Sequence, residues 1–271
     1  MNTSNIVRGL WGGICPAFFI PVSLVVPFGA RAKAPLCRPV FRTLLALLFL
    51  SWFMPGVVLA ETKAQADQKY ILVTGFEPFG GAKTNGSWEA VRHLQGTVIA
   101  NKKVVVHQLP VIWENASKKL LTLVREYHPV AVVAFGEAGA EPVKVELIAK
   151  NIRDMISDNS GKQPATGFIS ASAPPTLRTT LNVNVIARQL QEAGIPVDLS
   201  QDAGGYLCNE TFFSLMNFPG TENALNIRRG FIHVPPLNAR VVMPDGSTLL
   251  FDKATLEKTA IVVIRAVGEG I

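Results

Sequence analysis

The chain is poor in cysteine, and its first sixty residues contain no Asp or Glu. Only three cysteines occur in 271 residues, and two of them, Cys15 and Cys37, lie in that acid-free segment. Cys208 is therefore alone in the rest of the chain, which argues against a disulfide framework there. The spacing of His93, His107 and His128 from carboxylates and from Cys208 is not that of metal ligands. The sequence thus predicts no metal site.

The acid-free segment has the features of an export signal. Arg38 and Arg42 precede an apolar run over residues 43–60 that ends in small residues. A basic stretch, an apolar core and a small-residue end are typical of a secretory signal. We expect cleavage after Ala60, a true start downstream of Met1, and export to the periplasm or the extracellular space. The apolar run nearly spans a bilayer, so an uncleaved membrane anchor is the alternative.

The remaining chain is long enough for one domain with a sizeable core. We expect residues 1–60 to be a leader, 61–68 a short linker, and 69–271 a single domain. The leader holds five of the 26 basic side chains and none of the 20 acidic ones, so the domain is nearly neutral. That balance gives no support for nucleic-acid binding. Contact with a membrane is expected only through the N-terminal segment.

Short apolar runs alternate with helical patterns along this domain. The expected strands are residues 69–74, 104–109, 130–135, 143–148, 197–200 and 230–234. The expected helices are residues 87–94, 114–127, 183–193, 206–218 and 253–267. This alternation predicts an α/β domain with a largely parallel sheet. Residues 156–178, rich in Ser, Gly, Pro and Asp, are expected to form a long loop with one short strand.

Cys208 stands where a strand-like run gives way to a helix-like run, and His233 ends another strand-like run. Ligand sites in open α/β sheets gather beyond the carboxyl ends of the strands. We expect the loop 75–85, the turn after Phe135, Cys208 and His233 to converge there. A helix N-terminus and a nearby imidazole both favour the reactive thiolate. Taken alone, Cys208 could equally be a buried core cysteine and His233 a core histidine.

Several motifs occur in order over residues 70–240. They are GFEPFGG (75–81), LPV (109–111), GEAG (136–139), ELIAKN (146–151), DNSG (158–161), AGGYLCN (203–209) and FIHVP (231–235). Together they resemble the type I pyroglutamyl peptidases, a family of cysteine peptidases. The resemblance implies an α/β/α three-layer sandwich with a largely parallel twisted sheet, of the phosphorylase/hydrolase-like kind. It also implies removal of N-terminal pyroglutamyl residues from small peptides, without metal or cofactor, by a homo-oligomer.

The resemblance further implies a Cys/His/Glu triad. Cys208 is then the nucleophile, His233 the base, and Glu146 the residue that orients the imidazole. The thiolate attacks the acyl carbon, and the imidazolium protonates the departing amine. Backbone N–H groups around Cys208 are expected to stabilise the oxyanion. On its own, Glu146 could equally be a surface carboxylate on an edge strand.

Four further residues are placed in a substrate pocket by the same resemblance: Phe76, Phe79, Asn85 and Glu137. The two phenylalanines would be walls for the flat apolar face of the pyrrolidone ring. By themselves they could equally be core aromatics. Asn85 is also a plausible helix N-cap, and the two roles are compatible.

Some positions depart from the family pattern. Leu147 and Ile156 stand where the family usually has arginines, although Arg153 is close enough in sequence to substitute for the second. Glu137 replaces an amide and Glu141 replaces an arginine. These changes remove positive charge and add negative charge around the pocket. Loss of an oxyanion donor can lower turnover by about a hundredfold or more.

A further departure is Gly86, which replaces a helix-starting proline. The sequence therefore leaves three functions open. The first is an exported pyroglutamyl peptidase whose activity is weakened. The second is a catalytically impaired relative that binds cyclic or N-blocked ligands. The third is a cysteine amidase with a shifted substrate.

Overall fold

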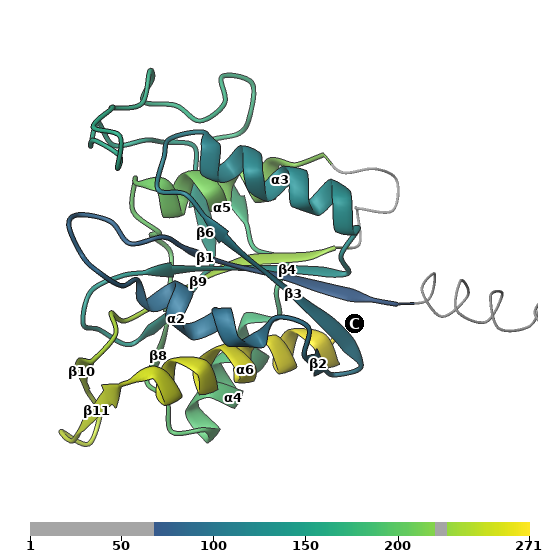
Figure 1. The fold of residues 1–271 in the computed structure, drawn as a ribbon, viewed down its shortest axis with the longest axis vertical. Helices are drawn as coiled ribbons and strands as arrows, with labels where there is room; N and C mark the ends of the chain where they lie inside the picture. The colour runs from purple at the N-terminus through teal and green to yellow at the C-terminus, as the bar shows by residue number, and fades with distance from the viewer. Residues whose placement is uncertain (1–67, 220–226) are drawn as a thin grey trace, which may run out of the picture. The chain divides into compact units, whose positions relative to one another are not determined.

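The short apolar runs become the buried strands of a central sheet. The computed structural model describes residues 68–219 and 227–271, and seven strands of this part pair in the order β2-β3-β1-β4-β9-β5-β8 (Figure 1). These are β1 (Tyr70–Phe76), β2 (Val98–Ile99), β3 (Lys102–Leu109), β4 (Ala131–Glu137), β5 (Val143–Glu146), β8 (Val197–Ser200) and β9 (Arg228–Val234). Every residue of β1 after Tyr70 is buried, as expected for a strand covered on both faces.

The sheet is mixed but mostly parallel. β3, β1, β4 and β9 run parallel to one another, whereas β5 runs antiparallel to β9. In that antiparallel pair Glu146 lies opposite Phe231, and Lys144 lies opposite His233. Side chains two residues apart on a strand share a face of the sheet. Glu146 and His233 are therefore diagonal neighbours on one face, within reach of each other.

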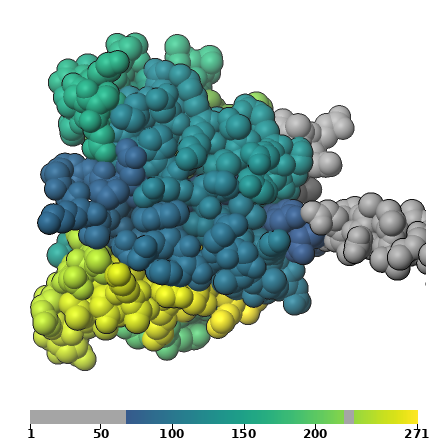
Figure 2. All heavy atoms as spheres, viewed as in Figure 1, coloured from purple at the N-terminus to yellow at the C-terminus, as the bar shows by residue number. Residues whose placement is uncertain are grey.

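Helices cover both faces of the sheet. They are α2 (Gly86–Val91), α3 (Asn115–Tyr127), α4 (Val183–Glu192), α5 (Leu207–Asn217) and α6 (Lys253–Glu269). α2, α4 and α6 pack on one face around Ile71 and Val73, while α3 and α5 pack on the other around Leu72 (Figure 1). In Figure 2, α6 (yellow) and α3 (teal) form opposite edges of the visible face. The expected α/β/α sandwich is confirmed.

Two antiparallel strand pairs lie outside the central sheet. β6 (Ile148–Lys150) pairs with β7 (Thr176–Arg178), the short strand expected in the long loop. The strand expected over 143–148 is confirmed for Val143–Glu146, which form β5. Its expected end was two residues too late, because β5 ends before Leu147, whose N–H donates to the carbonyl of Ser200, and Ile148 already belongs to β6. β10 (Ala239–Val242) and β11 (Thr248–Phe251) form a hairpin that the sequence analysis did not predict. The expected leader, residues 1–60, lies outside the described residues.

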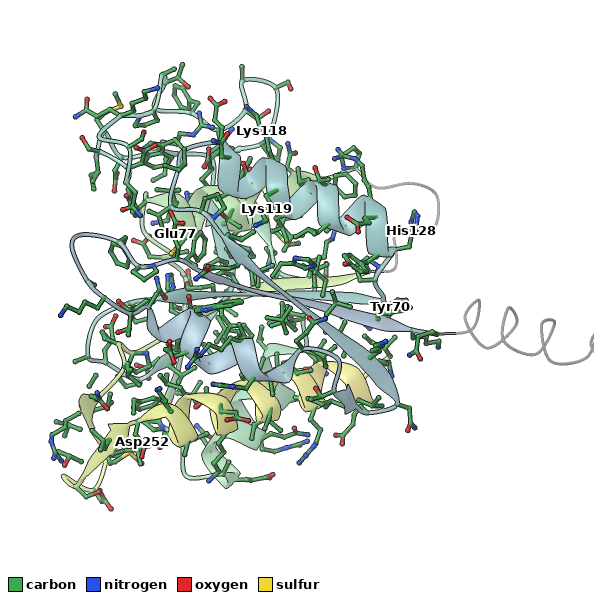
Figure 3. The ribbon with its side chains drawn as sticks, in the orientation of Figure 1. Tyr70, Glu77, Lys118, Lys119, His128 and Asp252 are labelled. Atoms are coloured by element: carbon green, nitrogen blue, oxygen red, sulfur yellow. The ribbon has the colours of Figure 1, made fainter. Side chains whose placement is uncertain are left out.

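Different residues and loops lie at the two ends of the sheet. Tyr70, at the start of β1, and His128, after α3, lie at one end, whereas Glu77 follows the carboxyl end of β1 (Figure 3). Glu77 is fixed there, since its Oε1 accepts hydrogen bonds from Val111 N (2.9 Å) and from the side chain of Asn159 (3.2 Å). Loops thus meet beyond the carboxyl ends of the parallel strands. None of the helices in the described residues is both long and apolar enough to cross a membrane.

Candidate active site

A cavity of about 310 Å³ opens at the carboxyl ends of β1, β4 and β9. Its lining includes six of the seven site residues predicted from the sequence: Phe76, Phe79, Asn85, Glu137, Cys208 and His233. The seventh, Glu146, lies behind His233 and does not line the cavity. A cavity of this volume has room for a small ring.

Cys208 lies in the first turn of α5, where it is half-buried. Tyr206, the N-cap residue, makes no capping bond with its side chain, and no acceptor in the described residues binds the N–H groups of Leu207 or Cys208. Free N–H groups at a helix start carry partial positive charge. Gly136 of β4 allows the sulfur to lie close, since a Cβ atom there would be 2.8 Å from Sγ. Cys208 thus lines the cavity at a helix start whose first backbone donors are unpaired.

His233 connects the thiol to a buried carboxylate. Its Nδ1 donates to Oε1 of Glu146 at 2.8 Å, which leaves Nε2 for Cys208. Burial, the largest single influence, lowers the pKa of His233. The charge of Cys208 and a hydrogen bond to it, together with Glu146, outweigh burial and raise that pKa to about 9. The imidazolium is thus the favoured form at neutral pH. Glu146 is fully buried, so its interpretation as a surface carboxylate is wrong.

Aromatic side chains form one wall of the cavity. Phe76 is buried and packs against Phe231 with ring centroids 6.4 Å apart. Phe79 lies 6.4 Å from the ring of Tyr206, which in turn meets Trp113 edge-on at 5.2 Å. Phe76 belongs to the core as well as to the cavity, so both interpretations of this residue hold. The wall presents ring faces and edges suited to an apolar ring.

Asn85 lies at the N-cap of α2 and also lines the cavity. Its Oδ1 accepts hydrogen bonds from the N–H and the hydroxyl of Ser87, at 2.9 and 2.6 Å. Its Nδ2 donates to the carbonyl of Glu77 at 3.0 Å. These bonds use both polar ends of the amide. Asn85 thus shapes the loop that carries Phe79, and its polar atoms are already engaged.

Glu137 is the acidic side chain that the sequence places at an amide position. Its Oε2 accepts a hydrogen bond from the N–H of Gly86. Burial raises the pKa of this carboxyl, and the Gly86 N–H opposes that rise. Glu141 does not line the cavity and pairs with Lys144 at 2.6 Å. Of the two acidic departures, only Glu137 changes the cavity itself.

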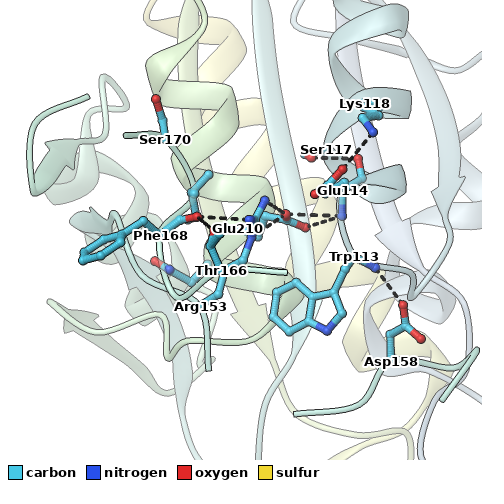
Figure 4. A network of polar contacts seen from close by, with 12 residues as sticks. Trp113, Glu114, Ser117, Lys118, Arg153, Asp158, Thr166, Phe168, Ser170 and Glu210 are labelled. Atoms are coloured by element: carbon cyan, nitrogen blue, oxygen red, sulfur yellow. Dashed lines mark hydrogen bonds and ion pairs between the residues drawn. The ribbon is translucent and has the colours of Figure 1, made fainter. Parts of the chain in front are cut away.

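Arg153 does not take the place of a missing arginine in the cavity. Its Nε and Nη2 donate to Oε1 of Glu210 at 2.9 and 2.6 Å, and its Nη1 donates to the carbonyl of Phe168 (Figure 4). Glu210 is fully buried and also accepts from the N–H of Glu114 at 3.0 Å. Arg153 lines a separate cavity instead. Arg153 therefore does not substitute for the arginine that the family usually has at the position of Ile156, and that expectation is wrong.

Sequence reasoning missed Glu210 and Asp154. Glu210 is the one charged side chain of α5 and lies two residues after Cys208, in a helix turn whose neighbours Phe212 and Phe213 are buried. A carboxylate in such a place indicates a buried partner. Asp154 lines the cavity beside Gly205, and its backbone N–H donates to the Gly205 carbonyl at 2.8 Å. Ile156, the other departure, is 51% exposed and lies outside the cavity lining. In the described ranges, no group of three His, Cys, Asp or Glu side chains could hold a metal ion.

Comparison with known proteins identifies the family. A model of the pyroglutamyl peptidase family matches residues 69–266. The chain belongs to this family. The pyrrolidone-carboxylate peptidase of Klebsiella pneumoniae is 36% identical over 197 residues, which are 71% of this chain and 91% of that protein. That of Cupriavidus pinatubonensis is 41% identical over 169 residues, 62% of this chain and 78% of that protein.

Solved structures give the same picture. Pyroglutamyl peptidase I from Bacillus amyloliquefaciens matches with a TM-score of 0.67 at 30% identity, covering 74% of this chain and 97% of that one. A mutant pyrrolidone carboxyl peptidase from Pyrococcus furiosus matches with a TM-score of 0.66, also at 30% identity, covering 74% of this chain and 99% of that one. Within the family, this chain combines a Cys/His/Glu cluster with an acidic cavity wall.

Proposed function

We propose that this chain is an exported cysteine peptidase that removes an N-terminal pyroglutamyl residue from small peptides. The observation that carries the proposal is the row of three side chains that runs inward from the cavity wall. Cys208 borders the cavity, His233 lies beside it, and Glu146 holds Nδ1 of the imidazole at 2.8 Å. Acyl transfer by a thiol requires a nucleophile, a base beside it, and a group that orients the base, and the three side chains lie in that order.

The chemistry follows from these positions. The Cys208 thiolate attacks the carbonyl carbon that joins the pyroglutamyl residue to the next residue, and a tetrahedral oxyanion forms. The free N–H groups at the start of α5 are placed to stabilise that oxyanion. The His233 imidazolium then gives its proton to the leaving amine as the C–N bond breaks. Water, deprotonated by the now neutral imidazole, hydrolyses the thioester and releases pyroglutamate.

Glu146 has an orienting role in this mechanism. Its buried carboxylate fixes the proton on Nδ1, so that Nε2 faces the thiol. It also stabilises the positive charge of the imidazolium. The aromatic wall with Phe76 and Phe79 would hold the pyrrolidone ring.

The test is turnover of a fluorogenic pyroglutamyl amide by the purified protein under reducing conditions. Cys208→Ala is the control, since it removes the sulfur and little else. Turnover that disappears in this variant supports the peptidase. A folded, reduced wild-type protein without turnover contradicts it and favours the binding protein. That second candidate is supported by the absence of Lys and Arg among the described cavity-lining residues.

Export is part of the same proposal and rests on residues 1–60 alone. The basic, apolar and small-residue order of that segment supports cleavage after Ala60. N-terminal sequencing of the protein from a periplasmic fraction tests it. A mature chain that begins at Glu61 supports the proposal. An intact chain that remains with the membrane fraction supports the anchored alternative instead.

A further inference from the structure

The cavity has an unbalanced charge. Two carboxylate side chains, Glu137 and Asp154, belong to its lining, and His233 is the one basic side chain among the described lining residues. His233 is already engaged by Cys208 and Glu146. Outside that pair, the cavity therefore offers a ligand negative charge and no cationic side chain.

Glu137 lines the cavity with one of its carboxylate oxygens bound to the backbone. It follows Gly136, the residue that the Cys208 sulfur approaches closely, and it lines the same cavity as Cys208. The N–H of Gly86 holds its Oε2 in place. Gly86 has no room for a side chain, because a Cβ atom would collide with the carbonyl of Pro235. No donor in the described residues binds Oε1 of Glu137, which leaves one oriented acceptor at the cavity wall.

The chemistry of this acceptor discriminates between two five-membered rings. A pyroglutamyl lactam brings one N–H donor and a carbonyl oxygen, and a carboxylate attracts the first and repels the second. A prolyl N-terminus has a ring of the same size without that oxygen. Its secondary amine is largely protonated at pH 7 and carries two N–H donors. Hydrogen bonds from a cation to a carboxylate are roughly twice as strong as neutral ones. The methylene groups of either ring can pack against Phe76 and Phe79.

We propose that Glu137 determines the specificity of this cavity and extends the substrate class to peptides with an N-terminal proline. The inference rests on the proposed thiol peptidase function. The reaction is the same acyl transfer: the Cys208 thiolate attacks the prolyl carbonyl carbon, and the C–N bond to the next residue breaks. His233 protonates the leaving amine, and water then releases free proline from the thioester.

Binding to the Cys208→Ala protein tests recognition apart from catalysis. L-prolinamide and L-pyroglutamamide are titrated by calorimetry at pH 7 into this variant, with and without Glu137→Gln. We expect Glu137→Gln to weaken prolinamide binding by at least about tenfold, since it removes a charge-assisted hydrogen bond. Binding of pyroglutamamide should stay equal or become tighter. Glu141→Gln is the matched control, because it removes the same charge outside the cavity and should leave both affinities unchanged.

Turnover of prolyl and pyroglutamyl amides by the wild-type protein completes the test. Prolyl turnover that falls in Glu137→Gln while pyroglutamyl turnover persists supports the inference. If pyroglutamamide binds and turns over but prolinamide does not bind, the inference is overturned and the proposed function stands. If prolinamide binds through Glu137 and neither amide turns over, the proposed function fails while the recognition remains. Equal loss of both ligands in Glu137→Gln also overturns the inference, because it indicates a structural role.

Discussion

Two fully buried carboxylates lie near the start of α5, and each is paired with a basic side chain. Glu146 binds His233 at 2.8 Å, and Glu210 binds Arg153 at 2.6 Å. The imidazole can lose its proton in the range where enzymes work, whereas the guanidinium stays charged. The first pair adjoins Cys208 at the cavity, and the second lies outside the cavity lining. The first is therefore suited to move a proton and the second only to hold its neighbours.

What Glu210 holds can be read from its partners. It binds the N–H of Glu114, the residue before α3, whose φ of 61° is uncommon for a residue with a side chain. It also binds Arg153, which reaches on to the carbonyl of Phe168. α5, the start of α3 and the long loop are thus joined at one buried carboxylate (Figure 4). The same kind of ion pair has an architectural role here and a proposed catalytic role at Glu146.

The largest effect on activity is expected from breaking the first ion pair, between Glu146 and His233. His233→Ala should lower kcat/KM for a pyroglutamyl amide by at least about a thousandfold, because it removes both the base and the proton donor. The measurement is steady-state kinetics, with circular dichroism to show that the variant is folded. A folded variant that keeps kcat/KM within about tenfold of the wild type would contradict the assigned role.

Arg153→Ala breaks the second ion pair, between Glu210 and Arg153. This change leaves the Glu210 carboxylate buried without its cation, which should lower the free energy of unfolding by about 3–5 kcal/mol. Urea unfolding measures the loss. The double variant Arg153→Met/Glu210→Leu removes both charges and should recover much of the stability. A double variant as unstable as the single one would show that packing, rather than the unpaired charge, causes the loss.

A smaller effect is expected from a substitution at Gly136, where the backbone of β4 lies close to the Cys208 sulfur. In Gly136→Ala the new Cβ atom would lie 2.8 Å from Sγ of Cys208 and from the Phe231 ring. Such overpacking should cost about 1–3 kcal/mol of stability, and displacement of the sulfur should slow turnover. Gly139→Ala is the matched control, because its Cβ atom would meet nothing closer than 3.9 Å. Equal behaviour of the two variants would refute a close fit at Gly136.

The pH dependence of activity tests the role of the His233 proton. The pKa of His233 is raised above its ordinary value to about 9, so the proton donated to the leaving amine is present below pH 9. Activity that needs this proton should fall as the pH rises through about 9. In Cys208→Ala the pKa of His233 should decrease, because the charge of the thiolate and its hydrogen bond are lost. Imidazole NMR titration of the two proteins measures the change, and an unchanged midpoint would show that Cys208 does not contact the ring.

Much of the fold could be predicted because its signals are local. Strands buried on both faces appear as apolar runs, and amphipathic helices repeat at helical spacing. The direction of β5 was not predictable in this way, since apolar runs look alike in parallel and antiparallel pairs. The β10–β11 hairpin did carry a local signal, Pro244-Asp245-Gly246, which is typical of a turn between strands.

The candidate site was predictable to a different degree at each residue. Cys208 and His233 follow from motifs at strand ends, and both line the cavity. The partners of Arg153 and Glu137 depend on tertiary contacts over 57 and 51 residues of separation, and no local pattern encodes those contacts. The replacement of a proline by Gly86 becomes intelligible only in the structure. A proline has no N–H to donate, whereas Gly86 donates one to Glu137.

The most direct test of the contrast between the two ion pairs is a parallel measurement on Glu146→Gln and Glu210→Gln. Each change replaces a buried carboxylate by an amide of nearly the same shape, and kcat/KM and urea unfolding are measured for both. The contrast predicts that Glu146→Gln lowers kcat/KM by about a hundredfold or more through the wrong imidazole tautomer. Glu210→Gln should lower stability and leave kcat/KM within about tenfold. An active Glu146→Gln beside an inactive, stable Glu210→Gln would contradict it.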